Sequence, residues 1–160
     1  MARGTAAGAG GAREPKRIRS LVCLDAFVPE SGQSAFDLLP PERAELFRAG
    51  AREQGDGWKI PPVPAERFGV TDAGDRAWVD GLCRPQPIAS FEQKLILTGA
   101  HEPIARRVYV LAAAYDPSAF QPVAARLKAE LGWRVHALPT GHDAMVTMPA
   151  ELAAILLQEA

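Results

Sequence analysis

The sequence predicts an α/β fold in which three parallel strands are joined by crossover helices and interrupted by an inserted helical segment. Three short and almost continuous apolar runs lie at about 20–26, 107–114 and 133–138. Runs of this kind are typical of strands that are buried on both faces of a parallel sheet. An amphipathic segment joins the second run to the third, so these two strands are expected to be parallel and connected by a right-handed crossover.

The first strand follows a lead that is expected to be disordered. Residues 1–16 are rich in Ala and Gly, and such a composition buries too little side chain to offset the entropy of ordering. The glycines of this lead fit neither of the common phosphate-binding loop patterns. The strand predicted at 20–26 then ends near Asp25 and Pro29.

The α/β core is expected to consist of 17–29 and 98–160, and residues 30–97 are expected to be an insertion that forms a cap. This insertion combines proline-rich loops with short helical patterns. Aromatic side chains on irregular backbone beside an α/β sheet suit a cap that covers a substrate, although each of them could equally hold together a small helical subdomain. The candidates for lining a substrate pocket are Trp58, Phe68, Trp78 and Phe91.

The C-terminal third alternates strand and helix. The second strand stops at Asp116, the third is followed by a turn that contains His142, and Pro149 suits the first turn of a final helix. The crossover helix is expected to bury Phe120, Val123, Ala124, Leu127 and Leu131 and to stop at Gly132. The final helix is expected to bury Leu152, Ile155 and Leu156.

Composition and charge exclude several classes of partner. The 160 residues are 48% apolar and 23% charged with a net charge of -1, as in ordinary soluble proteins, which predicts no nucleic-acid partner and no membrane partner. No apolar run has the length of a secretory signal or a membrane span, so a cytoplasmic location is expected. Cys23 and Cys83 have neither a CxxC pair nor a histidine at metal-ligand spacing, so no metal and no cofactor are expected.

His142 and Asp116 are the candidate catalytic residues. Each follows a strand at the carboxyl end of the predicted parallel sheet, where open α/β folds place their sites. The two side chains are therefore expected to lie within hydrogen-bond distance, so that the carboxylate orients the imidazole as a general base. Asp25, at the end of the preceding strand, is the alternative acid, and a purely structural His142 is the competing interpretation.

Three segments carry a resemblance to a known family. The segments LVCLDAFVPESGQSAFDLLP, RPQPIASFEQ and LPTGHDAMVTMPAELAAILL resemble the esterase branch of the α/β-hydrolases, which includes pyrethroid hydrolases and plant methylesterases and to which hydroxynitrile lyases are similar. The resemblance covers about residues 17–157 and corresponds to the C-terminal part of that fold. It implies a carboxylic ester hydrolase with a small-molecule ester substrate, in which Asp116 and His142 are acid and base.

The sequence departs from the family in one large respect. Serine esterases of this fold place their nucleophile in a Gly-x-Ser-x-Gly turn, and none of the serines of this chain stands in that pattern. No nucleophile is therefore assigned, and the chain is expected to be an inactive fragment on its own, with self-association through an exposed sheet edge. The alternatives are a non-catalytic hydrolase remnant, a small-molecule binding module, or hydroxynitrile-lyase-like chemistry in the complete protein.

Overall fold

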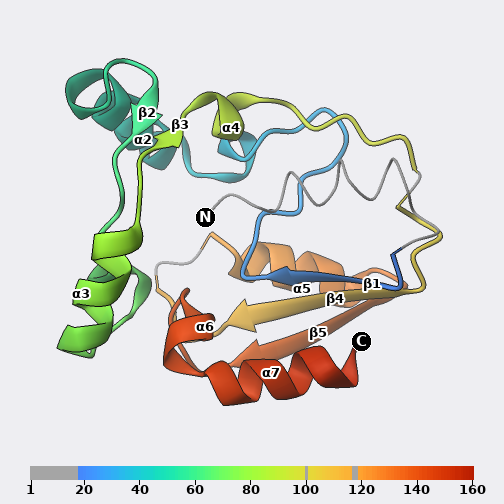
Figure 1. The fold of residues 1–160 in the computed structure, drawn as a ribbon. Helices are drawn as coiled ribbons and strands as arrows, with labels where there is room; N and C mark the ends of the chain where they lie inside the picture. The colour runs from blue at the N-terminus through green and yellow to red at the C-terminus, as the bar shows by residue number, and fades with distance from the viewer. Residues whose placement is uncertain (1–17, 100, 117–118) are drawn as a thin grey trace.

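The computed structural model describes residues 18–99, 101–116 and 119–160, so the predicted lead lies outside the described residues. Its main sheet has three parallel strands in the order β1-β4-β5 (Figure 1). These strands are β1 (Ser20–Leu24), β4 (Arg106–Ala112) and β5 (Trp133–Leu138). The α/β fold class and the parallel sheet are confirmed, and each strand lies within a residue or two of its predicted range.

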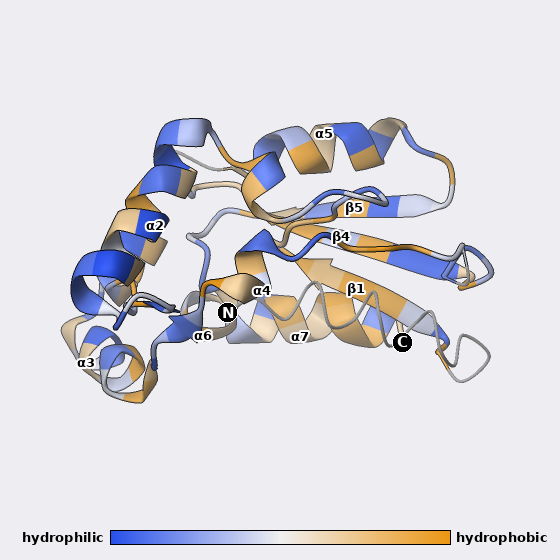
Figure 2. Cartoon of the chain, turned by 90° about the horizontal axis from the view of Figure 1, so that it is seen from above, coloured by the Kyte–Doolittle hydropathy of each residue, from blue (hydrophilic) through white to orange (hydrophobic). Residues whose placement is uncertain are grey.

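Helices cover both faces of this sheet, as the view from above shows (Figure 2). Helix α5 (Gln121–Ala129) lies on one face, and the short α6 (Ala144–Thr147) and α7 (Pro149–Gln158) lie on the other. The side chains of β4 alternate between the two layers, as the pleat of a strand requires. Val108 and Val110 pack toward α7, whereas Tyr109 packs against α5, and all three are fully buried.

Two predicted core leucines prove to be exposed. Leu131 is 93% exposed because α5 already ends at Ala129, which leaves this residue in the turn that leads to Gly132. Gly132 has a φ of +87°, so it reverses the chain into β5 in a conformation that glycine adopts easily. Leu156 is 42% exposed, and the buried stripe of α7 consists of Leu152 with Ile155 packed beside it.

The segment between β1 and β4 forms a separate group of short elements near the carboxyl ends of the strands (Figure 1). Its helices are η2 (Phe36–Leu38), α2 (Pro41–Gln54), η3 (Ala65–Phe68), α3 (Ala73–Leu82) and α4 (Ala89–Glu92). A two-residue antiparallel ribbon pairs β2 (Lys59–Ile60) with β3 (Gln86–Pro87). This group has a core of its own, built from Phe36, Ala44, Ala51 and Ile60 with Leu39, Phe47, Ile88 and Phe91 packed against them.

Candidate active site

Asp25 is fixed at the carboxyl end of β1 by bonds to β4. Its backbone N–H donates to the carbonyl of Val110 at 2.7 Å, and its Oδ1 accepts from the N–H of Ala112 at 3.0 Å. The residue has a φ of +38°, a region in which aspartate is enriched among residues other than glycine. The next residue, Ala26, both accepts from and donates to the hydroxyl of the buried Tyr109. Because both residues are held, the direction of the Asp25 carboxylate is set by the core of the sheet.

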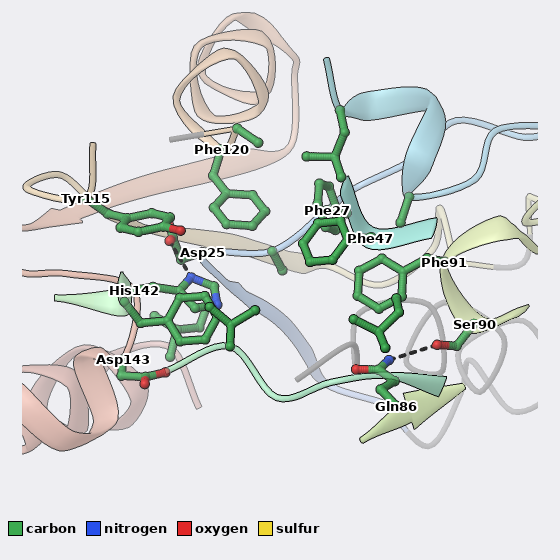
Figure 3. Close-up of a pocket in the computed structure, with 18 of the residues that line it drawn as sticks. Asp25, Phe27, Phe47, Gln86, Ser90, Phe91, Tyr115, Phe120, His142 and Asp143 are labelled. Atoms are coloured by element: carbon green, nitrogen blue, oxygen red, sulfur yellow. Dashed lines mark hydrogen bonds and ion pairs between the residues drawn. The ribbon is translucent and has the colours of Figure 1, made fainter. Parts of the chain in front are cut away.

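The second oxygen of this carboxylate contacts His142. Oδ2 of Asp25 lies 2.7 Å from Nδ1 of His142, and the side chain of Asp25 is fully buried. An ionised carboxylate only accepts hydrogen bonds, so Nδ1 carries the proton and donates a hydrogen bond to Asp25. In the neutral imidazole Nε2 is then unprotonated and can accept a proton. Figure 3 shows this second ring nitrogen on the side of the cavity.

The structure does not bring Asp116 to His142, so the predicted pairing is wrong and the alternative acid occupies that position. After β4 the backbone continues along the end of β5, with the N–H of Ala114 bonded to the carbonyl of Thr140. This path turns the ring of Tyr115 toward His142, at 5.5 Å between centroids, and leaves Asp116 exposed. Asp116 follows a strand at the same edge of the sheet as His142, but it does not contact the imidazole. The side chain of the adjacent Tyr115 points toward His142 instead.

Three aromatic rings surround His142. Phe120 stacks on the imidazole with 5.3 Å between centroids and 13° between planes, and Tyr115 lies at 5.5 Å (Figure 3). The ring of Phe68 lies at 5.0 Å from the imidazole. The His142 side chain keeps 18% of its surface exposed. The imidazole is thus held in a largely apolar enclosure that is open on one side.

The open side leads into a cavity of about 460 Å³ between the sheet and the elements that join β1 to β4. Its lining includes Asp25 and His142 at one end and Gln86 and Ser90 at the other (Figure 3). Among the four aromatic residues predicted to line a pocket, Phe68 and Phe91 do so. A cavity of this size, mostly apolar and with a few polar groups, is typical of a small-molecule site.

The other two predicted pocket residues lie outside this lining. Trp58 is 53% exposed and contacts the ammonium group of Lys59, and Trp78 is 60% exposed on α3, a helix that buries none of its residues. Both residues therefore lie at the surface, and neither side chain is among those that line the cavity. Sequence reasoning missed the pocket residues Phe27, Phe47, Gln86, Tyr115 and Phe120. Tyr115 and Phe120 lie close to the candidate residue Asp116 in the sequence, and this closeness was the signal that could have identified them as pocket residues.

Two titratable groups in the cavity have shifted pKa values. Burial raises the pKa of the Asp143 carboxyl, and the neighbouring His142 opposes that rise. Burial raises the pKa of the Cys23 thiol to about 11, so Cys23 is a poor nucleophile at neutral pH. The carboxyl groups of Asp25 and Asp143 both lie near His142, and Asp25 is the one that bonds to the imidazole.

The end of η3 also contacts the turn that carries His142, through a close approach of two backbones. A Cβ on Gly141 would lie 2.3 Å from the carbonyl oxygen of Phe68 and 2.7 Å from the Cα of Gly69. Only glycine allows this approach. The contact fixes the position of η3, and with it the ring of Phe68, relative to His142.

Within the described residues, no group of three or more His, Cys, Asp or Glu side chains is arranged to hold a metal ion. Over the same part of the chain, no helix has both the length and the apolar character needed to cross a bilayer.

Comparison with known proteins identifies the fold. No protein-family model matches the chain. The chain is 45% identical over 145 residues to the carbendazim-hydrolyzing esterase of Nocardioides sp. (strain SG-4G), and the match covers 86% of the chain and 59% of that enzyme. It also superposes on an extracellular α/β-hydrolase from a Paenibacillus species with a TM-score of 0.72 at 20% identity, covering 94% of the chain and 65% of that structure.

The chain has part of an α/β-hydrolase fold. A His-to-Ala variant of tomato methylketone synthase I superposes with a TM-score of 0.71 at 15% identity, over 99% of the chain and 67% of that protein. A His-to-Ala variant of PytH gives 0.57 at 20% identity, over 97% of the chain and 65% of that structure. The resemblance to α/β-hydrolase esterases is thus confirmed. The chain spans 59% of the length of its curated esterase relative.

Proposed function

We propose that this chain carries the acid and the base of a carboxylic ester hydrolase, with His142 as the base and Asp25 as the acid. The observation that carries this proposal is the 2.7 Å contact between His142 Nδ1 and Asp25 Oδ2 beside an apolar cavity. The 45% identity to an esterase supports the class of reaction. The substrate proposed is a small ester with an apolar, aromatic-sized body, because Phe47, Phe68 and Phe91 line the cavity.

The proposed pair would work as follows. Asp25 holds the imidazole in the tautomer with a proton on Nδ1, so Nε2 faces the cavity and can take the proton of an attacking hydroxyl group. The carboxylate then stabilises the imidazolium that forms, and the imidazolium returns the proton to the leaving alcohol. The aromatic rings around His142 make its surroundings less polar, which strengthens both interactions.

The nucleophile and the oxyanion donors are not assigned to any residue of this chain, because its sequence has no Gly-x-Ser-x-Gly. We therefore propose that the chain alone does not hydrolyse simple aryl esters above a His142→Ala control. Loss of one oxyanion donor alone costs roughly 10²–10³ in rate. The test measures release of 4-nitrophenol from its acetate and butyrate esters by both proteins. Turnover that depends on His142, with acyl label trapped on one serine, would contradict the proposal.

A chimera separates the esterase proposal from a non-catalytic role. The part of the carbendazim esterase that this chain does not match is joined to this chain, so that the complete length of the relative is restored. Ester hydrolysis by the chimera that is lost in His142→Ala supports the acid–base proposal. A folded chimera that binds aromatic esters in the cavity but hydrolyses none favours a binding module, and cleavage of a cyanohydrin without ester hydrolysis favours lyase chemistry on the same fold.

We also propose that the chain self-associates through β1. Within the described residues, β1 pairs only with β4, and its side chains are half-buried. An apolar strand with one unpaired edge offers free N–H and C=O groups to another chain. Light scattering coupled to size exclusion is expected to show a dimer or larger species, and Val22→Lys is expected to increase the monomer fraction. A monodisperse monomer with slow amide exchange at 21–24 would contradict this.

A further inference from the structure

The end of the cavity remote from His142 has a polar group whose orientation is fixed. Gln86 lies on β3, directly opposite Ile60 of β2 in the antiparallel ribbon. Directly opposed residues of such a ribbon project from the same face. Because Ile60 is buried in the core of the cap and lines the cavity, Gln86 projects toward the cavity as well.

A chain of two hydrogen bonds sets the direction of the Gln86 amide. The hydroxyl of Ser90 donates to the carbonyl oxygen of Pro87 at 2.7 Å, and Nε2 of Gln86 lies 2.8 Å from Ser90 Oγ. A carbonyl oxygen only accepts, so the single proton of Ser90 is committed to Pro87 and the serine oxygen must accept from Gln86. The amide nitrogen is thereby turned to Ser90, and the amide oxygen is turned away from it.

The amide oxygen is therefore an acceptor that faces the cavity. Within the described residues, Oε1 of Gln86 makes no hydrogen bond, whereas Nε2 bonds to Ser90. Figure 3 shows this oxygen on the side of the amide toward His142. The ribbon is anchored at the same place, since the N–H of Ile88 donates to the carbonyl of Trp58 at 2.9 Å. An acceptor held in this way needs no reorganisation when a ligand binds.

We propose that Gln86 is a specificity-determining residue that accepts a hydrogen bond from an N–H or O–H group on the ligand, at the end remote from the reacting carbonyl. The preferred class of ligand is thus an aromatic ester with a hydrogen-bond donor at its far end. This inference rests on the proposed function, because it takes the cavity as the ester-binding pocket. A ligand without the donor leaves the amide oxygen desolvated and unpaired, and buried polar groups left unpaired are what allow a site to discriminate.

The test uses fluorescent naphthoate esters that differ only at the remote position. Methyl 6-hydroxy-2-naphthoate supplies a donor, and methyl 6-fluoro-2-naphthoate has nearly the same size without one. Fluorescence titration of the protein is expected to give a Kd for the hydroxy ester that is roughly 3- to 10-fold lower, the worth of one neutral hydrogen bond. Methyl 6-methoxy-2-naphthoate, which only accepts, is expected to bind no better than the fluoro ester.

Three variants assign the preference to this amide. Gln86→Met keeps the length of the side chain without its oxygen and is expected to abolish the preference. Ser90→Ala frees the amide to rotate and is expected to reduce the preference of the protein for the hydroxy ester over the fluoro ester. Gln93→Met, at an exposed position just after α4, is the matched control and is expected to retain the full preference. Ser90→Ala answers the question even if Gln86→Met fails to fold.

The inference is overturned by equal Kd values for the hydroxy and fluoro esters, by tighter binding of the methoxy ester, by a preference that survives Gln86→Met, or by failure of all three esters to bind. Its outcome is separable from that of the proposed function. Loss of discrimination with intact hydrolysis by the chimera overturns only the role of Gln86. Discrimination without hydrolysis supports the role of Gln86 and overturns the esterase proposal.

Discussion

Two histidine–carboxylate pairs lie along β5 and the turn that follows it, and they are alike in their primary geometry. His142 Nδ1 lies 2.7 Å from Asp25, and His136 Nε2 lies 2.9 Å from Glu159. Both carboxylates are about 1% exposed. By distance and burial alone, either pair could be chosen as the acid and base of an active site.

Their surroundings differ. Glu159 also accepts from Arg134 at 2.8 Å, so this carboxylate is shared with a cation and ties the end of the chain to β5. Asp25 instead accepts from the backbone N–H of Ala112, and its histidine borders a cavity. A buried histidine–carboxylate contact is therefore not sufficient to identify a catalytic pair. The cavity beside the second ring nitrogen distinguishes the two pairs.

The largest effect expected from this comparison is on ester hydrolysis by the chimera. His142→Ala is expected to lower kcat/KM by about 10²–10⁴-fold, the usual contribution of a general acid–base group. His136→Ala is expected to change it less than about 3-fold, because the His136 imidazole is not among the residues that line the cavity beside His142. Steady-state kinetics on a 4-nitrophenyl ester measures both. Equal losses in the two variants would mean that the pairs are not functionally distinct.

A second experiment sharpens the choice of acid. Asp25→Asn in the chimera is expected to lower kcat by roughly 10²–10⁴-fold, since an amide in place of the carboxylate favours the wrong tautomer of His142. Asparagine also tolerates the positive φ of this position, so the effect isolates the carboxylate. Asp116→Asn is the matched control and is expected to leave kcat nearly unchanged. A loss confined to Asp116→Asn would return the acid role to that residue.

The third prediction concerns the contact that holds His142 from the side of the cap. Gly141→Ala is expected to destabilise the fold by roughly 1–3 kcal/mol, because the new Cβ would meet the backbone of Phe68 and Gly69. The Nδ1 proton resonance of His142 is expected to shift as the turn moves. Gly81→Ala, within α3 and with open space around its Cβ, is the control and is expected to be neutral or slightly stabilising. Equal urea midpoints for the two variants would rule out the backbone contact.

The smallest effect is expected from the pH dependence of the second pair. The hydrogen bond from His136, together with Arg134, holds the pKa of Glu159 below its usual value, although burial opposes the shift. A lowered folded-state pKa adds stability that is present above the unfolded-state pKa and is lost as pH falls through the folded-state value. The stability difference between the native protein and Glu159→Gln is therefore expected to shrink below about pH 4.5. Urea unfolding at pH 7 and pH 3 measures it, and a constant difference would contradict the assignment.

The sequence alone determined the parallel sheet and the position of its final histidine. Apolar runs at 20–26, 107–114 and 133–138 favour strands, because short and continuous apolar runs are typical of strands covered on both faces. Pro149 was likewise expected in the first turn of the final helix, and α7 begins at this residue, since proline fits the first turn of a helix. Strands and helix starts of this kind depend on the residues of one short segment, so they can be predicted from that segment alone.

Only the tertiary structure decided which acid meets His142 and which aromatic residues line the cavity. Asp25 and Asp116 both follow strands at one edge of the sheet, so sequence spacing cannot separate them. The choice depends on the direction of single side chains: the positive φ of Asp25 and its bonds to β4 turn it inward, whereas Tyr115 takes the inward direction beside Asp116. Trp58 and Trp78 are exposed for a related reason. A side chain's direction within a loop or cap is set by contacts with residues far away in sequence, and these contacts leave no local pattern.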